Sequence, residues 1–212
     1  MPSVTRRPLG NRQERRERIE AGLLAAAERL MRDGTSFTEL SVDRLATAAG
    51  ISRATFYIYF EDKGDLLRRL ARQVFGELAD DASMWWNVAS LRRPADMEAT
   101  IGRILGDYRR HQPLIGALNE MSGYDAAVAA TYRELMTGIT AGLVKVITDG
   151  QDDGSIRPEL PVAATASALT WMVERACHQN LPYQTIEHDR ELASALTQII
   201  WAALYLKPYR SS

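Results

Sequence analysis

The chain has 212 residues, of which 46% are hydrophobic, enough for one sizeable core or for a small domain joined to a larger one. Its net charge of −1 is unevenly spread: residues 1–72 carry 14 of the 26 basic and 10 of the 27 acidic residues, which leaves 12 and 17 for residues 73–212. A single cysteine excludes an internal disulfide and a cysteine-based metal site. No apolar run reaches bilayer length and the N-terminus is polar, so we expect a cytoplasmic protein with no membrane partner.

Residues 41–60 have the pattern of two short helices joined by a tight turn. Ser41 is a typical N-cap residue, and the apolar residues that follow it recur with helical spacing up to Gly50, which favours the left-handed conformation that ends a helix. Ser52 can cap a second helix at once, with Phe56 and Phe60 as its buried residues. This pattern predicts a helix-turn-helix, whose second helix enters the major groove of DNA.

The rest of the chain reads as helix as well, so the predicted fold class is all-α. Gly34 ends a first supporting helix, and Gly and Pro residues separate the later ones. The expected helices besides the two above cover about 14–33, 62–82, 95–110, 113–121, 125–148, 161–179 and 187–206. No alternating strand pattern with turn signals competes with them.

Roughly the first third of the chain, which contains the predicted helix-turn-helix, resembles the DNA-binding domain of the TetR family of one-component repressors. The family's motif positions are met here by Ala26, Ala27, Gly34, Ser41, Ala49, Gly50, Ile51, Ser52, Tyr57, Tyr59, Phe60 and Lys63. The run SRATFYIYF is similar to the actinobacterial subgroup that includes the ethionamide-resistance repressor. Glu61 and Gly64 depart from the family pattern, and we expect both to soften DNA affinity without removing the motif.

The predicted DNA contacts divide by chemistry. Arg53 and Thr55, in the first turn of the second helix, are expected at base edges, because the arginine fork matches guanine O6 and N7. Tyr57 and Tyr59 are expected to contact the backbone or thymine methyl groups. Helix starts favour phosphate oxygens, although the serines there could equally be simple caps. The candidate set is Ser41, Ser52, Arg53, Ala54, Thr55, Tyr57, Tyr59 and Lys63.

Arginines also crowd the residues that precede this module. Arg6, Arg7 and Arg12 lie in the expected arm, and further arginines follow it directly. Two interpretations are open: a solvated tail, or an arm that folds onto phosphates or into the minor groove. The position next to a helix-turn-helix favours the second.

The resemblance implies that the remaining two-thirds form a helical domain that binds a ligand and pairs with a second copy through the last two helices. Large or pliable side chains on the central helices are candidates for an effector cavity as a group, although any single one of them is more often ordinary core. They are Tyr108, Leu114, Ile115, Tyr132, Met136, Thr170, Trp171, Met172 and Trp201. Glu174, Arg175 and His178 either orient the polar end of a ligand or form a surface pair.

Enzymatic interpretations find no support in the motifs. Glu174 and His178 have the wrong spacing for a di-iron bundle, and there is no nucleophile elbow, phosphate-binding loop or dinucleotide fingerprint. Cys177 beside His178 is a weak thiol-redox signal and is more typical of a small buried residue. We therefore expect no catalytic residues, no cofactor and no metal.

The resulting hypothesis is a ligand-responsive repressor that binds a palindromic operator in double-stranded DNA as a homodimer and is released by a small apolar or amphipathic effector. Its expected parts are a basic arm (1–13), the helix-turn-helix domain (14–61), a linking helix (62–82) and a ligand-binding and dimerisation domain (83–212). The alternative is a helical small-molecule-binding protein without operator function.

Overall fold

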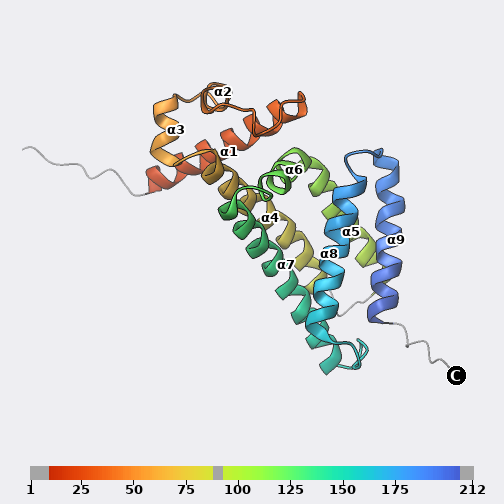
Figure 1. Cartoon of the computed structure of the whole chain (residues 1–212). Helices are drawn as coiled ribbons and strands as arrows, with labels where there is room; N and C mark the ends of the chain where they lie inside the picture. Colours follow the sequence, from red (N-terminus) through yellow and green to blue (C-terminus); the bar gives the residue numbers. More distant parts are fainter. Residues whose placement is uncertain (1–9, 88–92, 206–212) are drawn as a thin grey trace, which may run out of the picture. The chain divides into compact units, whose positions relative to one another are not determined.

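The computed structural model describes residues 10–87 and 93–205, and in these ranges every regular element is an α-helix (Figure 1). The helices are α1 (Gly10–Arg32), α2 (Val42–Ala48), α3 (Arg53–Tyr59), α4 (Lys63–Asn87), α5 (Pro94–Arg110), α6 (Gln112–Met121), α7 (Ala126–Asp152), α8 (Val162–Asn180) and α9 (Ile186–Leu204). The predicted all-α fold class, with an N-terminal helix-turn-helix, is confirmed. None of the described helices is both long and apolar enough to span a membrane.

Backbone contacts divide the described chain into two compact units. The N-terminal unit comprises residues up to 71 together with 113–129, and the bundle unit comprises 72–112 and 130 onwards. Helix α4 starts in the first unit and continues into the second, so the two share one uninterrupted helix. The segment 113–129, which contains most of α6, groups with the helix-turn-helix rather than with the bundle that follows it in the sequence.

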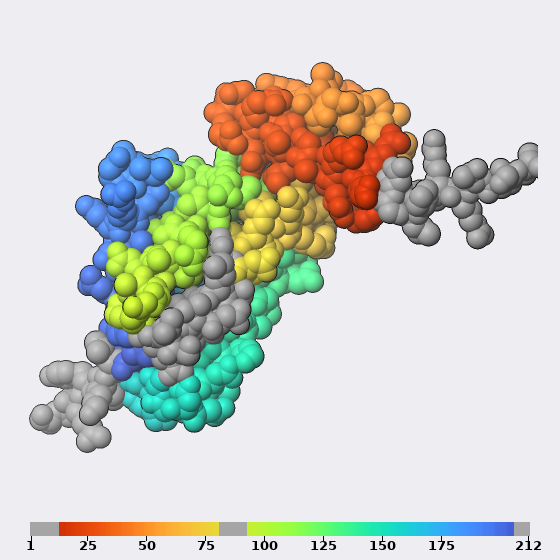
Figure 2. Space-filling model, turned by 180° about the vertical axis from the view of Figure 1, so that it is seen from behind, coloured from red at the N-terminus to blue at the C-terminus, as the bar shows by residue number. Residues whose placement is uncertain are grey.

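The N-terminal unit is built around α1, α2 and α3. Helix α2 packs against both α1 and α3, and Figure 2 shows α2 and α3 (orange) lying together beside α1 (red). The two predicted helix-ending glycines have positive φ, 90° at Gly34 and 71° at Gly50, which explains why α1 and α2 end there. Large apolar side chains fill the space between these helices and are fully buried: Leu23, Leu45, Phe37, Phe56 and Phe60.

In the bundle unit, α5 packs along α9 (Figure 1). A bidentate ion pair fixes this contact: Arg109 of α5 donates from Nη2 and Nε to Asp189 of α9, with N–O distances of 2.6 and 2.8 Å. The same guanidinium donates to the Leu181 carbonyl oxygen at 3.0 Å, in the turn between α8 and α9. Arg109 therefore holds the α8–α9 turn and the start of α9 against the end of α5.

Candidate DNA-reading surface and effector cavity

Both predicted serine caps are present in the helix-turn-helix. The Ser41 hydroxyl oxygen accepts from the Arg44 backbone N–H at 3.2 Å at the start of α2. The Ser52 hydroxyl oxygen accepts from the Thr55 N–H at 3.0 Å and lies 2.8 Å from the Thr55 hydroxyl at the start of α3. Each serine is exposed, so a hydroxyl that caps its helix remains accessible to a phosphate oxygen.

Helix α3 presents one exposed face made of Arg53, Ala54, Tyr57 and Ile58. The opposite face buries Phe56, whose ring meets the Phe60 ring with centroids 5.1 Å apart, while Thr55 and Tyr59 lie at the border and are partly buried. Ile58 is 73% exposed and was missing from the predicted DNA contacts. A large apolar side chain on the exposed face of a recognition helix is the signal that could have identified it, because such a residue can pack on thymine methyl groups.

Arg53 is held in place by its neighbours in the absence of DNA. Its Nη1 donates to the Asp43 carboxylate of α2 at 2.8 Å, and its guanidinium lies 5.6 Å from the centre of the Tyr57 ring. The charge of Asp43, followed by the interaction with Tyr57, raises the pKa of Arg53 above its ordinary value. Both partners of the ion pair are 60% exposed, so the pair orients Arg53 without burying it.

Lys63 has a different environment from the other predicted DNA contacts. At the first residue of α4, its ammonium donates to the Thr38 carbonyl oxygen at 2.7 Å and to the Phe37 carbonyl oxygen at 3.4 Å. Burial lowers the pKa of Lys63. This lysine therefore ties the α1–α2 connection to the start of α4, in addition to any contact it makes with phosphate.

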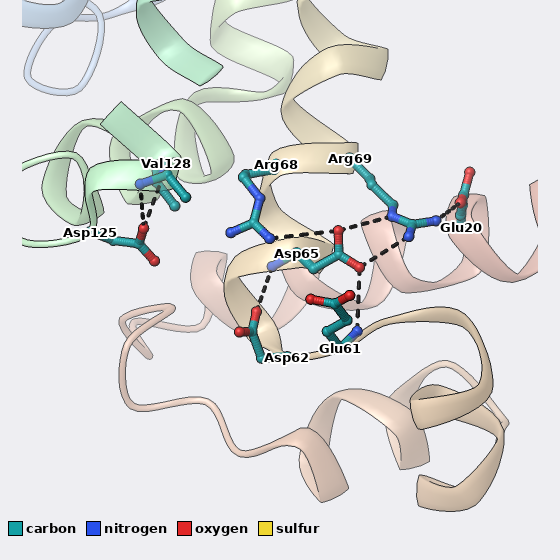
Figure 3. Close-up of polar contacts among 9 residues, drawn as sticks. Glu20, Glu61, Asp62, Asp65, Arg68, Arg69, Asp125 and Val128 are labelled. Atoms are coloured by element: carbon teal, nitrogen blue, oxygen red, sulfur yellow. Dashed lines mark hydrogen bonds and ion pairs between the residues drawn. The ribbon is translucent and has the colours of Figure 1, made fainter. Parts of the chain in front are cut away.

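A polar network joins α1 to the start of α4 (Figure 3). Asp65 accepts from Arg69 Nε at 3.1 Å, and the same guanidinium lies 3.5 Å from Glu20 of α1. Asp62 caps α4 by accepting from the Asp65 N–H at 2.7 Å. The arginine thus connects one carboxylate on each helix, which fixes the direction in which α4 leaves the helix-turn-helix.

Gly64 lies where this network meets α7. A Cβ atom there would come within 3.1 Å of both Asp62 Oδ1 and Asp125 Oδ2 and within 3.2 Å of Arg68 Nη1. Asp125 caps α7 by accepting from the Ala127 and Val128 N–H groups at 2.9 and 3.0 Å (Figure 3). The departure from the family pattern at Gly64 therefore has a packing reason, because two helix starts converge on this residue.

The expected basic arm overlaps with α1. Residues 10–13 already belong to this helix, and Arg6 and Arg7 lie outside the described residues, as does the side chain of Arg12. Within α1, Arg15 and Arg18 are exposed, whereas Arg16 pairs with Glu20 at 3.1 Å.

A cavity of about 150 Å³ lies inside the bundle unit among α4, α5, α7, α8 and α9. Aliphatic and aromatic side chains form most of its wall. The lining residues are Phe75, Leu78, Met97, Thr100, Ile101, Ile104, Tyr108, Met136, Ile139, Leu143, Leu169, Thr170, Val173, Glu174, Cys177 and Ile200. Such an apolar enclosure with few polar groups is typical of a small-molecule site.

Three of the predicted effector residues line this cavity: Tyr108, Met136 and Thr170. The other six lie elsewhere. Leu114 and Ile115 are buried in α6, in the N-terminal unit. Trp171 is 38% exposed, Met172 is half-buried, and Trp201 stacks on Tyr205 with ring centroids 4.3 Å apart. Tyr132 reaches the cavity indirectly, through its hydrogen bond to Glu174.

Most of the lining residues were absent from the sequence prediction, among them Phe75 and Leu78, which lie on the helix expected to link the domains. Apolar periodicity shows that α4 has a buried face but does not show what that face contacts. Glu174, for which two interpretations were open, lines the cavity and is only 7% exposed. Its partner Arg175 lies on the outside, with the side chain 58% exposed.

The cavity does not support thiol chemistry. Cys177 is buried, and burial, followed by the charge of Glu174, raises the pKa of its thiol to about 12. The thiolate is the reactive form, so this cysteine is a packing residue at neutral pH. The described residues contain no group of three or more His, Cys, Asp or Glu side chains placed to hold a metal ion.

Comparison with known proteins identifies the class of molecule. Residues 23–70 match the family model of bacterial regulatory proteins, tetR family. The chain is 32% identical over 179 residues to the HTH-type transcriptional regulator EthR of Mycolicibacterium smegmatis, covering 82% of this chain and 80% of that protein. This chain belongs to the TetR family. The EthR of Mycobacterium tuberculosis strain CDC 1551 is 32% identical over 173 residues, 81% of this chain and 76% of that protein.

Solved structures share the TetR-family fold at lower identity. A tetR-family transcriptional regulator from Streptomyces coelicolor matches with a TM-score of 0.67 and 24% identity over 90% of this chain and 80% of that one. FadR from Bacillus subtilis, solved in complex with stearoyl-CoA, matches with a TM-score of 0.66 and 16% identity over 87% and 99%. The protein is thus a DNA-binding transcriptional regulator of a non-enzymatic family, which disfavours the alternative without operator function.

Proposed function

We propose that this regulator is a repressor that binds a palindromic operator as a homodimer, and that a small apolar or amphipathic effector in the bundle cavity releases it from DNA. The observation that carries the proposal is the course of α4. Its first residues belong to the unit that contains α3, and Phe75 and Leu78, further along the same helix, line the cavity. A molecule that displaces these two side chains acts on the helix that continues into the DNA-reading unit.

The size of the cavity supports a switch. About 150 Å³ is the volume of an engineered cavity that binds benzene. An effector that widens this space by displacing Phe75 and Leu78 would bind the widened conformation more tightly than the one described. Differential affinity of this kind is the condition for a ligand to shift a conformational equilibrium. The B. subtilis FadR, solved in complex with stearoyl-CoA, is a precedent for an amphipathic ligand with a long acyl chain in this fold.

The homodimer is proposed from the outer faces of α8 and α9. Trp171 of α8 is 38% exposed and Ile199 of α9 is 51% exposed, although both are large apolar side chains. Several of their exposed neighbours on the two helices are small, although Arg175 and Gln198 are exposed there as well; the small ones are Ala164, Ala168, Ala195 and Ala202. Small residues around large apolar ones allow two helix pairs to approach closely, as a self-complementary interface requires.

The operator experiment uses the full-length protein and a random duplex library. Two reading heads related by a two-fold axis should select a palindrome whose half-sites are about 34–36 Å apart, or a multiple of that distance. The selected duplex is then titrated with protein while chemically diverse apolar ligands are added. Selection of non-palindromic sequences alone would contradict the dimeric operator, and a library in which no ligand weakens binding would contradict the switch.

A further inference from the structure

We propose that Glu174 is the recognition group of the bundle cavity and selects an effector with an apolar body and a protonated amine head. The inference rests on the proposed effector function and adds to it the chemical class of the effector. Among the described residues that line the cavity, Glu174 is the one charged side chain.

The two carboxylate oxygens of Glu174 have different surroundings. Oε1 accepts from the Tyr132 hydroxyl at 2.8 Å, a buried hydrogen bond between α8 and α7. Oε2 is buried and accepts no hydrogen bond from the described residues. Oε2 forms an ion pair with Arg175, whose Nε lies 3.8 Å away and whose side chain is 58% exposed, so most of its charge interacts with water. One carboxylate oxygen of this cavity-lining side chain thus lacks a donor among the described residues.

Among the other polar groups of the lining, the Thr100 and Tyr108 hydroxyls already have partners, and Thr170 contributes a neutral hydroxyl. The Thr100 hydroxyl donates to the Asp96 carbonyl oxygen at 3.0 Å and accepts from Arg103 Nη2 at 2.9 Å. The Tyr108 hydroxyl lies 3.5 Å from His178 Nδ1. Burial, followed by the charge of Glu174, raises the pKa of Tyr108, so its phenol keeps its proton. These groups offer a ligand little in comparison with Glu174 Oε2.

An ammonium group is the best chemical complement to this oxygen. A buried carboxylate with an unfilled acceptor site is costly, and a charge-assisted N–H···O bond supplies the missing donor and the opposite charge together. A neutral hydroxyl supplies only the donor, and a carboxylate on the ligand would place two like charges in an apolar enclosure. The preference should therefore run from amine to alcohol to carboxylate for one common apolar body.

The test uses three probes with the same phenylethyl body: phenethylamine, phenethyl alcohol and hydrocinnamate. Binding to the purified full-length protein is measured by calorimetry, without DNA. We expect the amine to bind about tenfold or more tightly than the alcohol, and hydrocinnamate to bind most weakly. In Glu174→Gln, which keeps an acceptor for Tyr132, the amine should lose this advantage. The matched control Glu134→Gln makes the same change on an exposed residue of α7, and this variant should still bind the amine more tightly than the alcohol.

The outcomes separate the inference from the function on which it rests. Equal binding of amine and alcohol to the unmodified protein, or no binding of the amine at millimolar concentration, overturns the role of Glu174 without needing any variant. If another apolar ligand releases operator DNA while the amine shows no preference, the switch stands and the inference fails. If the amine binds through Glu174 but leaves operator affinity unchanged, the recognition chemistry is supported and the effector role of the cavity is refuted.

Discussion

At the scale of single residues, DNA reading depends on how Arg53 is presented. Its ion pair with Asp43 joins two side chains that are each 60% exposed, and such pairs contribute about 0–1 kcal/mol. The Arg53 guanidinium can therefore leave Asp43 and bind DNA with little loss of free energy. The contact with Tyr57, another exposed residue of α3, also restrains the guanidinium. Asp43 and Tyr57 thus pre-orient a base-reading group without competing strongly for it.

Arg53→Ala should weaken operator binding by about 1–3 kcal/mol and relax the base preference at one position in each half-site. Lys63→Ala should instead weaken binding to all sequences alike and reduce the salt slope by about one. Because Lys63 also bonds two carbonyl oxygens, this second variant should melt at a lower temperature. Binding isotherms at several salt concentrations, with sequence selection for each variant, measure both effects. An unchanged sequence preference in Arg53→Ala would remove Arg53 from base reading.

Tyr132→Phe tests the buried hydrogen bond to Glu174. Removing the hydroxyl takes away the donor to Oε1 and leaves both oxygens of a buried carboxylate without a hydrogen bond. The free energy of unfolding should therefore fall by about 1–3 kcal/mol. Tyr183→Phe is the matched control, since Tyr183 is 80% exposed, and it should change stability very little. Urea unfolding of the two variants provides the comparison. Equal stabilities would mean that the Tyr132 hydroxyl contributes nothing net.

At the scale of elements, α4 has two roles along its length. Its first turn carries the network of Asp62, Asp65 and Arg69 that fixes it to α1, and its middle carries Phe75 and Leu78 into the cavity wall. The start of α7, capped by Asp125, meets the first turn of α4 at Gly64. A displacement of α4 at the cavity therefore acts on a helix whose other end is held by ion pairs and helix caps.

Two glycines of α4 provide a matched pair. Gly76 has open space around it, so Gly76→Ala should stabilise the protein by about 0.5–1 kcal/mol through helix propensity alone. Gly64→Ala should lack this gain, because its Cβ would displace Asp62 and Asp125 from their capping positions. Chemical unfolding of both variants measures the difference. Equal stabilisation at the two positions would show that the contacts at Gly64 adapt freely.

At the scale of the whole molecule, the proposed repressor needs a second copy of itself and a coupling between cavity and DNA. The outer apolar residues of α8 and α9 are available for the first requirement. The coupling between cavity and DNA requires only that an effector prefer one of two conformations. This coupling is reciprocal, so operator DNA must weaken effector binding by the same factor by which the effector weakens DNA binding.

Ile199→Glu should convert the dimer into a monomer, because it would bury two carboxylates against an apolar interface. Ile58→Glu is the control, since Ile58 is 73% exposed on α3 and lies outside the proposed interface. Sedimentation of both variants gives their oligomeric states. The Ile199→Glu variant should also lose cooperative binding to the palindrome. If it stays dimeric instead, the interface lies elsewhere.

Thr170→Trp should fill the cavity and uncouple DNA binding from the effector. Thr170 is buried and lines the cavity, so a bulkier residue there takes the space that a ligand needs. In the unmodified protein, effector-dependent stabilisation and operator release should occur over the same concentration range. In the variant, both should disappear together while operator binding remains. Ligands that stabilise the unmodified protein without any change in DNA affinity would identify a binding site that is not a switch.

The helices and the helix-turn-helix could be predicted from the amino-acid sequence, because their signals are local. The caps at Ser41 and Ser52 and the left-handed glycines Gly34 and Gly50 act within a few residues of their own position. The buried rings Phe56 and Phe60 follow from periodicity, which assigns each residue to a face of its own helix.

Which of those helix faces meet around a cavity could not be predicted in this way and depends on how the helices pack. Trp171 appeared suited to a cavity wall and lies on the outer face of α8, whereas Leu78 appeared to belong to a connecting helix and lines the cavity. The sequence likewise left open whether Glu174 orients a ligand or forms a surface pair. In the structure, the Tyr132 hydroxyl of α7 lies 2.8 Å from one of its carboxylate oxygens, and the other oxygen has no donor among the described residues. Periodicity marks the buried face of a helix, but the partner of that face depends on contacts between residues far apart in the chain, which no local pattern contains.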